Sequence, residues 1–210
     1  MKKKTKNKIL DTSLSLFNER GMSNVTLRQI AKEMKISQGN LNYHFRKRSD
    51  IINALYQQLV EKINLVFKQM EDVKSGIGQM MLSAEKTFRL LQDYRFILTD
   101  FVHIMREEAE IKAHFIALRN FRNDQFQRIF QHMLERGNMI PEAYPGQWKS
   151  LILRINLLGD FWISSAEILD NELDKEEQFQ KYYSAIMEEL YPYMSPKAQR
   201  ALLNDFGIQF

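Results

Sequence analysis

The sequence of 210 residues contains no cysteine, only four prolines and only eight glycines. The absence of cysteine excludes disulfide bonds, thiolate metal ligands and cysteine nucleophiles, and it fits a reducing, cytoplasmic environment. The longest stretches without a formally charged residue are ten residues long. A membrane-spanning helix requires about 20 apolar residues. We therefore expect a cytoplasmic protein that does not contact a membrane.

Regular alternation of β-branched residues, which would predict strands, is also missing, and the first proline is Pro141. Residues with good helix propensity fill the long intervals between the few glycines and prolines. We therefore predict an all-α fold, in which an N-terminal three-helix domain is joined by a long helix to a C-terminal helical bundle. The expected helices span residues 5–20, 27–34, 38–44, 49–72, 79–92, 95–106, 110–136, 146–169, 174–192 and 196–206.

Acidic residues are scarce at the start of the chain, and the modest net charge of +4 conceals this. Residues 1–50 carry twelve Lys and Arg against four Asp and Glu, whereas the rest of the chain carries eighteen against twenty-two. The sixteen residues between Glu33 and Asp50 contain four basic side chains and no acidic one. A surface that binds phosphate groups cannot carry carboxylates at low cost. The pattern therefore indicates that the first quarter of the chain binds a polyanion.

Two short helices with a short turn between them are expected inside this basic segment. Thr26 is a candidate N-cap for the first helix, where Gln29 completes a capping box, and Ser37 is a candidate N-cap for the second. Each helix has an apolar side, as two crossing helices require. The segment is thus a helix-turn-helix candidate, although a helical hairpin with a solvated basic face has the same spacing. The apolar positions are Leu27, Ile30, Ala31, Met34, Ile36, Leu41 and Phe45.

The stretch from Thr26 to Phe45 reads TLRQIAKEMKISQGNLNYHF and is followed by RKRSDI. It resembles the N-terminal DNA-binding domain of the TetR-type (tetracycline-repressor-like) transcriptional regulators. The family pattern runs Thr-x-x-x-Ile-Ala, a Gly-Val-Ser turn and Gly-x-Leu-Tyr-x-His-Phe, followed by a short basic step into a long helix. The segment from Ile9 to Gly21 matches the family's first helix as well. Beyond about residue 55, the resemblance lies in helix number and chain length.

The resemblance implies a division of the chain and a function. Residues 1–47 would form the helix-turn-helix DNA-binding domain, and residues 48–210 would form the ligand-binding and dimerisation domain. The protein would be a homodimeric regulator of palindromic double-stranded DNA, and a repressor that an unknown small, largely apolar effector releases. A DNA-binding regulator without a small-molecule effector, controlled by a protein partner or by its abundance, is the alternative.

Residues 37–44 would be the recognition helix in the major groove, with Gln38 and Asn40 reading base edges. Asn42 stands where the family has a phosphate-contacting Tyr, so a base contact is also open to it. Lys35 stands where the family often has Gly in the turn, and a Lys in left-handed conformation costs about 1 kcal/mol. The residues expected to contact DNA are Thr26, Arg28, Ser37, Gln38, Gly39, Asn40, Asn42, Tyr43, His44, Arg46, Lys47 and Arg48.

Aromatic residues recur in the remainder of the chain, where most are expected to fill a bundle core and some to line the implied apolar pocket. They include Phe88, Tyr94, Phe96, Phe101, Phe115, Phe121, Phe126 and Phe130. Polar residues within apolar helical stretches are candidate ligand contacts, although such residues are more often hydrogen-bonded core or interface groups. The candidates are Asp100, His103, Asn156 and Asp160. Apolar stripes on the helices over 146–169 and 174–192 predict a dimer interface at Trp148, Ile155, Trp162, Phe179, Tyr183 and Ile186.

Signals for catalysis or for a bound metal are missing. Of the four histidines, His103, His114 and His132 are too far apart along helices to share one ion. The sequence contains no Gly-rich phosphate-binding loop and no nucleophile elbow. We therefore expect no enzyme activity, no cofactor and no metal.

Overall fold

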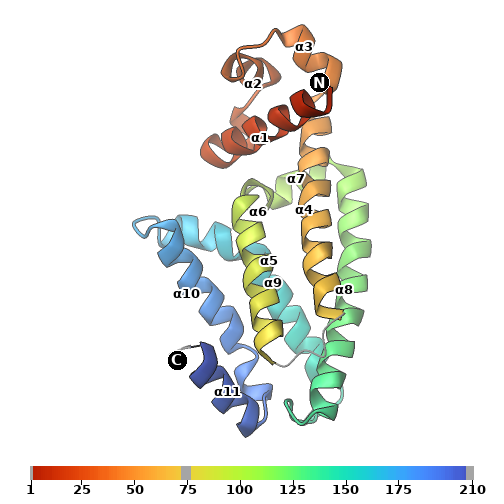
Figure 1. The fold of residues 1–210 in the computed structure, drawn as a ribbon, viewed down its shortest axis with the longest axis vertical. Helices are drawn as coiled ribbons and strands as arrows, with labels where there is room; N and C mark the ends of the chain where they lie inside the picture. Colours follow the sequence, from red (N-terminus) through yellow and green to blue (C-terminus); the bar gives the residue numbers. More distant parts are fainter. Residues whose placement is uncertain (1, 72–76, 207–210) are drawn as a thin grey trace. The chain divides into compact units, whose positions relative to one another are not determined.

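A computed structural model describes residues 2–71 and 77–206. Every regular element in these two ranges is an α-helix or a 3-10 helix, and no regular strand occurs in them (Figure 1). The α-helices are α1 (Lys2–Arg20), α2 (Leu27–Glu33), α3 (Gln38–His44), α4 (Arg48–Glu71), α5 (Ile77–Asp93), α6 (Phe96–Thr99), α7 (Phe101–Glu107), α8 (Ala109–Glu135), α9 (Gln147–Leu169), α10 (Lys175–Glu188) and α11 (Pro196–Phe206). Two 3-10 turns, η1 (Met22–Asn24) and η2 (Tyr191–Tyr193), complete the described elements. The predicted all-α class is confirmed. None of the described helices combines the length and the apolar character needed to span a bilayer.

Most predicted helix ends agree with the structure to within a few residues, but two predicted helices are interrupted. The stretch predicted over 95–106 breaks into α6 and α7 at Asp100, whose ψ of 16° departs from helical geometry. The helix predicted over 174–192 ends at Glu188, and the 3-10 turn η2 follows it. Pro192 has no N–H to donate, so the α-helical hydrogen bonds cannot continue through it. At the other end of the chain, α1 begins at Lys2, so the lysine-rich start is helical.

The chain forms two compact units. The first comprises residues 1–64 and 90–113, and the second comprises residues 65–89 and 114–210. Helices α4, α5 and α8 have residues in both units. The first unit is thus larger than the predicted DNA-binding domain of residues 1–47, whose boundary remains a prediction about function.

Helices α1, α2 and α3 lie together in the first unit (Figure 1), and apolar side chains fill the space between them. Ile9 of α1, Ile30 of α2 and Leu41 of α3 are completely buried. Helix α1 also packs on α6, where the ring centroids of Phe17 and Phe96 lie 5.1 Å apart. Burying a side chain of this size contributes about 1.5–3 kcal/mol relative to exposure. This apolar centre therefore stabilises α2 and α3, which have seven residues each and are too short to be stable alone.

Polar contacts join the end of α1 and η1 to the segment around α6. The Asn18 side-chain amide donates to the Asp93 carbonyl at 2.8 Å, and its Oδ1 accepts from the Phe96 N–H at 3.1 Å. The Asp100 carboxylate accepts from the Met22 N–H at 2.9 Å. Each of these bonds satisfies a backbone group that neither helix can satisfy by itself. The end of α1 and η1 are thereby attached to residues that lie about 75 positions later in the sequence.

The turn between α2 and α3 begins with a Schellman motif. The Lys35 N–H donates to the Lys32 carbonyl at 3.1 Å, and the Ile36 N–H donates to the Ala31 carbonyl at 3.0 Å. Lys35, which stands where the resembled family often has Gly, has a φ of 55°. Helix α8 ends in the same pair of bonds, but there the left-handed residue is Gly137. A Lys in this conformation costs about 1 kcal/mol relative to Gly.

The second unit is packed around aromatic rings. The ring of Trp162 on α9 contacts Phe88 of α5 and Phe179 of α10, with centroid separations of 6.0 and 6.3 Å. Trp162 and Phe179 are both buried. Ring pairs at these distances contribute about 0.5–1.5 kcal/mol beyond the area they bury. The aromatic residues of α5, α9 and α10 therefore form much of the core of this unit.

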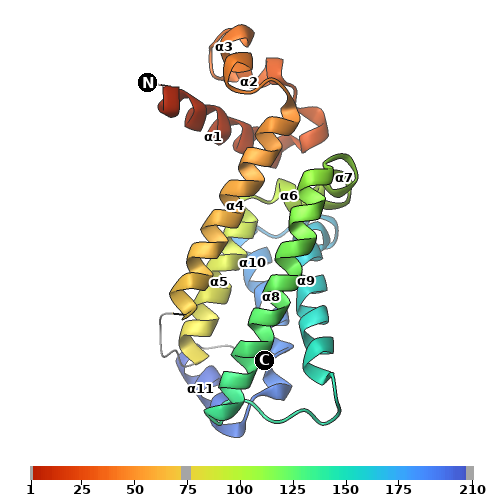
Figure 2. The ribbon, with the colours of Figure 1, turned by 90° about the vertical axis from the view of Figure 1, so that its right-hand side faces the viewer.

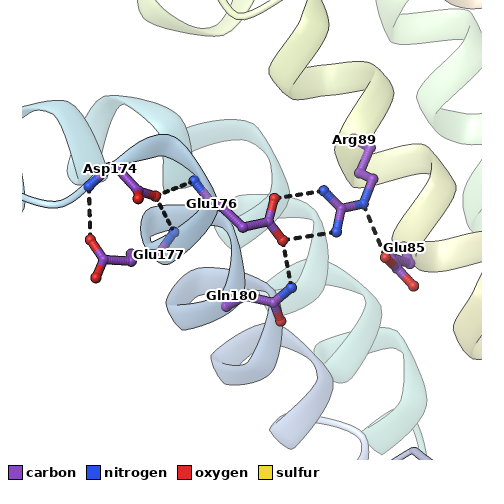
Figure 3. A network of polar contacts seen from close by, with 6 residues as sticks. All are labelled: Glu85, Arg89, Asp174, Glu176, Glu177 and Gln180. Carbon is purple, nitrogen blue, oxygen red and sulfur yellow. Dashed lines mark hydrogen bonds and ion pairs between the residues drawn. The ribbon is translucent and has the colours of Figure 1, made fainter.

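A polar network joins α5 to the N-terminus of α10 (Figure 3). Two hydrogen bonds of 3.0 Å link the Arg89 guanidinium to the Glu176 carboxylate. Hydrogen bonds from Arg89 and then Gln180 lower the pKa of Glu176 to about 2. Asp174 caps α10 by accepting from the Glu177 N–H at 2.9 Å, and the Glu177 carboxylate accepts from the Asp174 N–H in return. The start of α10 is thus fixed in place against α5.

Replacing Asp100 with alanine should destabilise the first unit. The Met22 N–H would lose its acceptor, and an unpaired donor at a largely buried site costs about 1–3 kcal/mol. We expect Asp100→Ala to lower the melting temperature by several degrees and to speed hydrogen exchange at the Met22 amide. Asp93→Ala is the matched control, because Asp93 is exposed and contributes its backbone carbonyl. Equal exchange rates at Met22 in both variants would contradict the assigned contact.

Candidate DNA-binding surface and internal cavity

Helix α3 has one anchored side and one exposed side. The Ser37 Oγ accepts from the Asn40 N–H at 3.1 Å, which confirms the predicted N-cap. Leu41 and Phe45, four residues apart, are buried and fix the rotation of the helix about its axis. The opposite side therefore faces solvent. Its exposed residues are Gln38, Gly39, Asn40, Asn42 and Tyr43.

Gly39 lies in the first turn of this exposed side. A Cβ atom placed on Gly39 would meet the Ser37 Oγ at 3.9 Å, an ordinary van der Waals contact. Packing inside the described protein therefore does not require glycine here. Close approach of a phosphate to the backbone, expected from the sequence, remains the proposed reason for it.

Thr26 and Arg28 lie at the start of α2, and both are exposed. The Thr26 Oγ1 accepts from the Gln29 N–H at 3.3 Å, and the Gln29 Oε1 accepts from the Thr26 N–H at 2.7 Å. The predicted capping box is thus confirmed. Because the box holds the Thr26 side chain at the protein surface, its position relative to α3 is defined before any DNA binds.

The basic segment that follows α3 is held by the carboxylate of Asp50, which lies in the first turn of α4. The Asp50 Oδ2 accepts from the N–H groups of Arg46 and Lys47, at 3.0 and 2.9 Å. The backbone of the step is therefore fixed, while both basic side chains are exposed. This geometry leaves the two cations able to reach phosphate groups.

Two other predicted DNA contacts are engaged with neighbouring residues. Arg48 is half-buried, and its guanidinium donates to backbone carbonyls in and after η1, the nearest being that of Met22 at 3.1 Å. His44 is half-buried, with its ring edge-on to Tyr43 at a centroid separation of 5.2 Å. Arg48 therefore has a structural role in holding η1, and any phosphate contact by it would be additional.

The surface of α3 and its flanks has the chemistry that double-stranded DNA requires. Side-chain amides on the exposed side of α3 can hydrogen-bond to base edges, and Arg and Lys beside them can bind phosphates. The stretch over 34–49 has no carboxylate to repel the DNA backbone. A short exposed helix with an anchored apolar side is the geometry by which a helix-turn-helix unit enters the major groove.

The second unit contains a partly open apolar cavity of about 90 Å³. Its walls come from α4, α5, α8, α9, α10 and the residue that precedes η2. None of the lining residues carries an ionisable group. They are Phe67, Met80, Ser83, Ala84, Thr87, Phe88, Phe126, Ile129, Phe130, Ile155, Met187 and Leu190.

Sequence reasoning identified part of this cavity. Phe88, Phe126 and Phe130 belong to the aromatic residues from which a pocket was expected. The lining face of α5 was missed, although Met80 and Ala84, one helical turn apart, follow the spacing of an apolar stripe. Such a stripe predicts burial, but it does not distinguish a packed core from a cavity wall.

The four polar residues predicted as ligand contacts lie elsewhere. Asp100 binds the Met22 N–H, and His103 is exposed on α7. Asn156 hydrogen-bonds to an asparagine of α8, and Asp160 pairs with Arg119 at 2.5 Å. Burial raises the pKa of Asp160, and the nearby guanidinium opposes this rise. None of the four lines this apolar cavity, although Asn156 lines a separate, open groove between α8 and α9.

The six residues predicted for a dimer interface contribute mainly to the interior of the protomer. Trp162, Phe179 and Ile186 are buried, and Trp148, Ile155 and Tyr183 are half-buried. A different set of apolar residues faces solvent on α9. Leu153, Leu157, Phe161 and Ile168 have exposed fractions of 59, 51, 40 and 76 %.

These four residues, which we call the α9 stripe, lie on one side of the helix because they are spaced by four, four and seven positions. Helix α8 lies beside α9 (Figure 2), joined to it by the Arg119–Asp160 ion pair. The α9 stripe is thus an apolar strip bordered by polar side chains, which is the composition of a protein–protein contact.

Two family models match the chain. The first is the TetR model, which is described as a bacterial transcriptional repressor, and it matches residues 44–202. The other, described as bacterial regulatory proteins of the tetR family, matches residues 9–55. Together they cover the helix-turn-helix unit and nearly all of the helices that follow it.

Similar proteins support the same grouping. The chain is 24 % identical over 200 residues to the HTH-type transcriptional regulator AcrR of Shigella flexneri, covering 89 % of each chain. A TetR-family regulator from Marinobacter aquaeolei VT8 superposes with a TM-score of 0.85 at 26 % identity, covering 95 % of each chain. The structure of a SmeT–triclosan complex has a TM-score of 0.62 at 14 % identity, covering 92 % of this chain and 93 % of that one. The chain therefore belongs to the TetR family, and it is a DNA-binding transcriptional regulator rather than an enzyme.

Proposed function

We propose that this regulator is a homodimeric repressor, and that a small, largely apolar ligand releases it from palindromic operator DNA by occupying the cavity of the second unit. The observation that carries the proposal is the cavity itself, whose twelve lining residues include no charged group. Residues 1–47 would supply the DNA contacts, and residues 48–210 would supply the ligand site and the dimer contact.

The exposed side of α3 supports a division of labour between base and phosphate contacts. Gln38 and Asn40 carry amides that suit the N6/N7 edge of adenine, whereas Lys47 carries a point charge that suits any phosphate. Changes at the two kinds of residue should therefore have different effects on sequence preference and on salt dependence.

Gln38→Ala should reduce discrimination between a preferred DNA duplex and its point variants, because a bidentate base contact contributes about 1–3 kcal/mol of discrimination. Lys47→Ala should weaken binding to every duplex alike and reduce the slope of log affinity against log salt by about one for each protomer bound. The duplex would be selected from a random-sequence library with the unaltered protein, and affinities measured by fluorescence anisotropy. If Gln38→Ala lowered the affinity for all duplexes by the same factor, Gln38 would not contact a base.

The size and lining of the cavity limit the ligand. An apolar cavity of about 150 Å³ in another protein binds benzene, so about 90 Å³ admits at most a single ring without rearrangement. Met80 and Met187 line the cavity, and flexible methionine side chains can move to admit larger compounds. SmeT, a protein of the same fold, binds triclosan in its solved complex. Neutral aromatic compounds are therefore the class to test.

Three helices offer a physical connection between the cavity and the DNA-binding unit. Helices α4, α5 and α8 each contribute lining residues, and each also has residues in the first unit. A ligand can release DNA through them only if it binds the DNA-incompetent arrangement more tightly than the competent one. A tenfold preference corresponds to about 1.4 kcal/mol.

Neutral aromatic compounds, including triclosan, should raise the melting temperature of the protein and lower its affinity for the selected duplex. A ligand at 100 times its Kd adds about 2.7 kcal/mol of stability. Ala84→Phe should abolish both effects, because the added ring fills the cavity. Ala185→Phe is the control, since Ala185 is exposed on α10. A hit that stabilises Ala84→Phe as strongly as the unaltered protein would place the ligand elsewhere.

The same screen separates the proposal from its alternative. If no compound of a broad neutral library binds while the duplex is bound tightly, a regulator without a small-molecule effector is favoured. In that case a protein partner or the abundance of the regulator would control DNA occupancy.

The α9 stripe supports a contact with a second copy of the chain. It includes no charged residue, and Ser164 between Phe161 and Ile168 is small enough to let another helix approach. A two-fold axis across one stripe would pair it with its own copy, as an isologous interface requires. Such a dimer would match a palindromic site, because both have two-fold symmetry.

Leu153→Asp should convert the protein to a monomer at micromolar concentration, because it would bury an unpaired carboxylate in the paired stripes. Sedimentation velocity would measure the oligomeric state, and binding to the selected duplex should weaken in parallel. Leu65→Asp is the matched control, because Leu65 on α4 is 61 % exposed and Leu153 is 59 % exposed. A Leu153→Asp protein that stays dimeric would exclude the α9 stripe as the interface.

A further inference from the structure

We propose that Lys35, in the turn between α2 and α3, is an additional DNA-contacting residue whose ammonium group binds a backbone phosphate beside the recognition helix. Lys35 is not among the residues that sequence reasoning assigned to DNA. The proposal rests on three observations, which concern its backbone conformation, its position in the turn and its electrostatic surroundings.

The backbone at Lys35 is strained. Lys35 is the one non-glycine residue with positive φ in the part of the chain that the structure describes. The other left-handed positions there are Gly21, Gly137 and Gly146. Helix α8 ends in the same Schellman bonds as α2 and uses Gly137 at the equivalent place. A strained conformation that glycine would relieve is commonly associated with a functional side chain.

The position of Lys35 suits a contact with the DNA backbone. It stands two residues before Ser37, the N-cap of α3. The N-terminal residues of a recognition helix contact base edges in the major groove, and the sugar-phosphate strands form the edges of that groove. A side chain in the turn directly before the helix therefore lies close to these strands. The flexible stem of lysine lets its charge reach a phosphate without a defined geometry.

The charge of Lys35 is available to a ligand. Its side chain is exposed, and it takes part in no ion pair among residues 2–71 and 77–206. No acidic residue follows it until Asp50. A solvated cation with no internal partner adds nothing to the fold that would offset the strain. Neutralising a phosphate and releasing its counterion is a gain that Gly could not provide.

Two substitutions separate the charge of Lys35 from its backbone strain. Lys35→Gln keeps a long side chain in the strained conformation and removes the charge. Lys35→Gly removes both the charge and the strain. Binding to the duplex selected with the unaltered protein would be measured by fluorescence anisotropy over a range of KCl concentrations, and stability by thermal denaturation.

Both variants should bind the duplex about 5- to 10-fold more weakly at moderate salt, with the slope of log affinity against log salt reduced by about one for each protomer bound. Lys35→Gly should also raise the melting temperature by about 2–4 °C, whereas Lys35→Gln should leave it nearly unchanged. In Lys35→Gly the stability should rise while the affinity for DNA falls, because the same residue carries both the backbone strain and the phosphate contact.

Lys197→Gln also removes one positive charge, but on α11 in the second unit. It therefore shows how much of any effect comes from the change in net charge alone. Its salt slope should equal that of the unaltered protein. A salt slope that is unchanged in both Lys35 variants would overturn the proposal, and so would equal loss of slope in Lys197→Gln. The experiment depends only on DNA binding, so its outcome is independent of the ligand and dimer proposals.

Discussion

The apolar contact between α1, α2 and α3 is the interaction on which the DNA-binding surface depends. Helix α3 has seven residues, and an isolated helix of that length is not stable in water. Leu41 and Phe45 are buried, and this burial both stabilises the helix and determines which side remains exposed. The amides that face solvent do so because the opposite side is held. Altering that apolar side would therefore reorient the exposed amides of α3 without removing any of them.

Backbone hydrogen bonds outside the helices position this apolar centre. Thr26 and Ser37 cap the two short helices, and Asp50 holds the basic step that follows. Asp100 and Arg48 bind opposite polar groups of η1, one accepting from its N–H and the other donating to its carbonyls. Each contact satisfies a group that a helix end leaves unpaired. The DNA-binding unit is thus a set of short helices whose ends, more than their lengths, determine its geometry.

Helix α9 illustrates how one amphipathic pattern can serve several purposes. Trp162 belongs to the core, Ile155 lines the cavity, and Leu153 and Leu157 face solvent. All four look alike in a sequence, because each is a large apolar residue in a helix with apolar residues on most sides. Their roles differ because the neighbouring helices α5, α8 and α10 cover one side of α9 and leave the other uncovered. The predicted dimer residues were drawn from the covered side for this reason.

Local interactions were predictable from the sequence alone. Most of the helices, the two N-caps and the capping box at Thr26 follow from residues within about five positions of one another. The acid-free segment over 34–49 is a property of composition and needs no structure to be seen. These features were sufficient to identify the DNA-binding unit and to indicate its family.

Only the tertiary structure decided the rest. It gave Asp100 a partner 78 positions away and Asp160 a partner 41 positions away, so that neither lines the cavity. It also brought residues of α4, α5, α8, α9 and α10 together around the cavity. The physical reason is that an apolar or polar residue in a helix requires a partner, but helical periodicity does not specify which distant segment provides it. The sequence by itself determined where most of the helices lie, and their packing decided which sides of them are core, cavity wall and exposed surface.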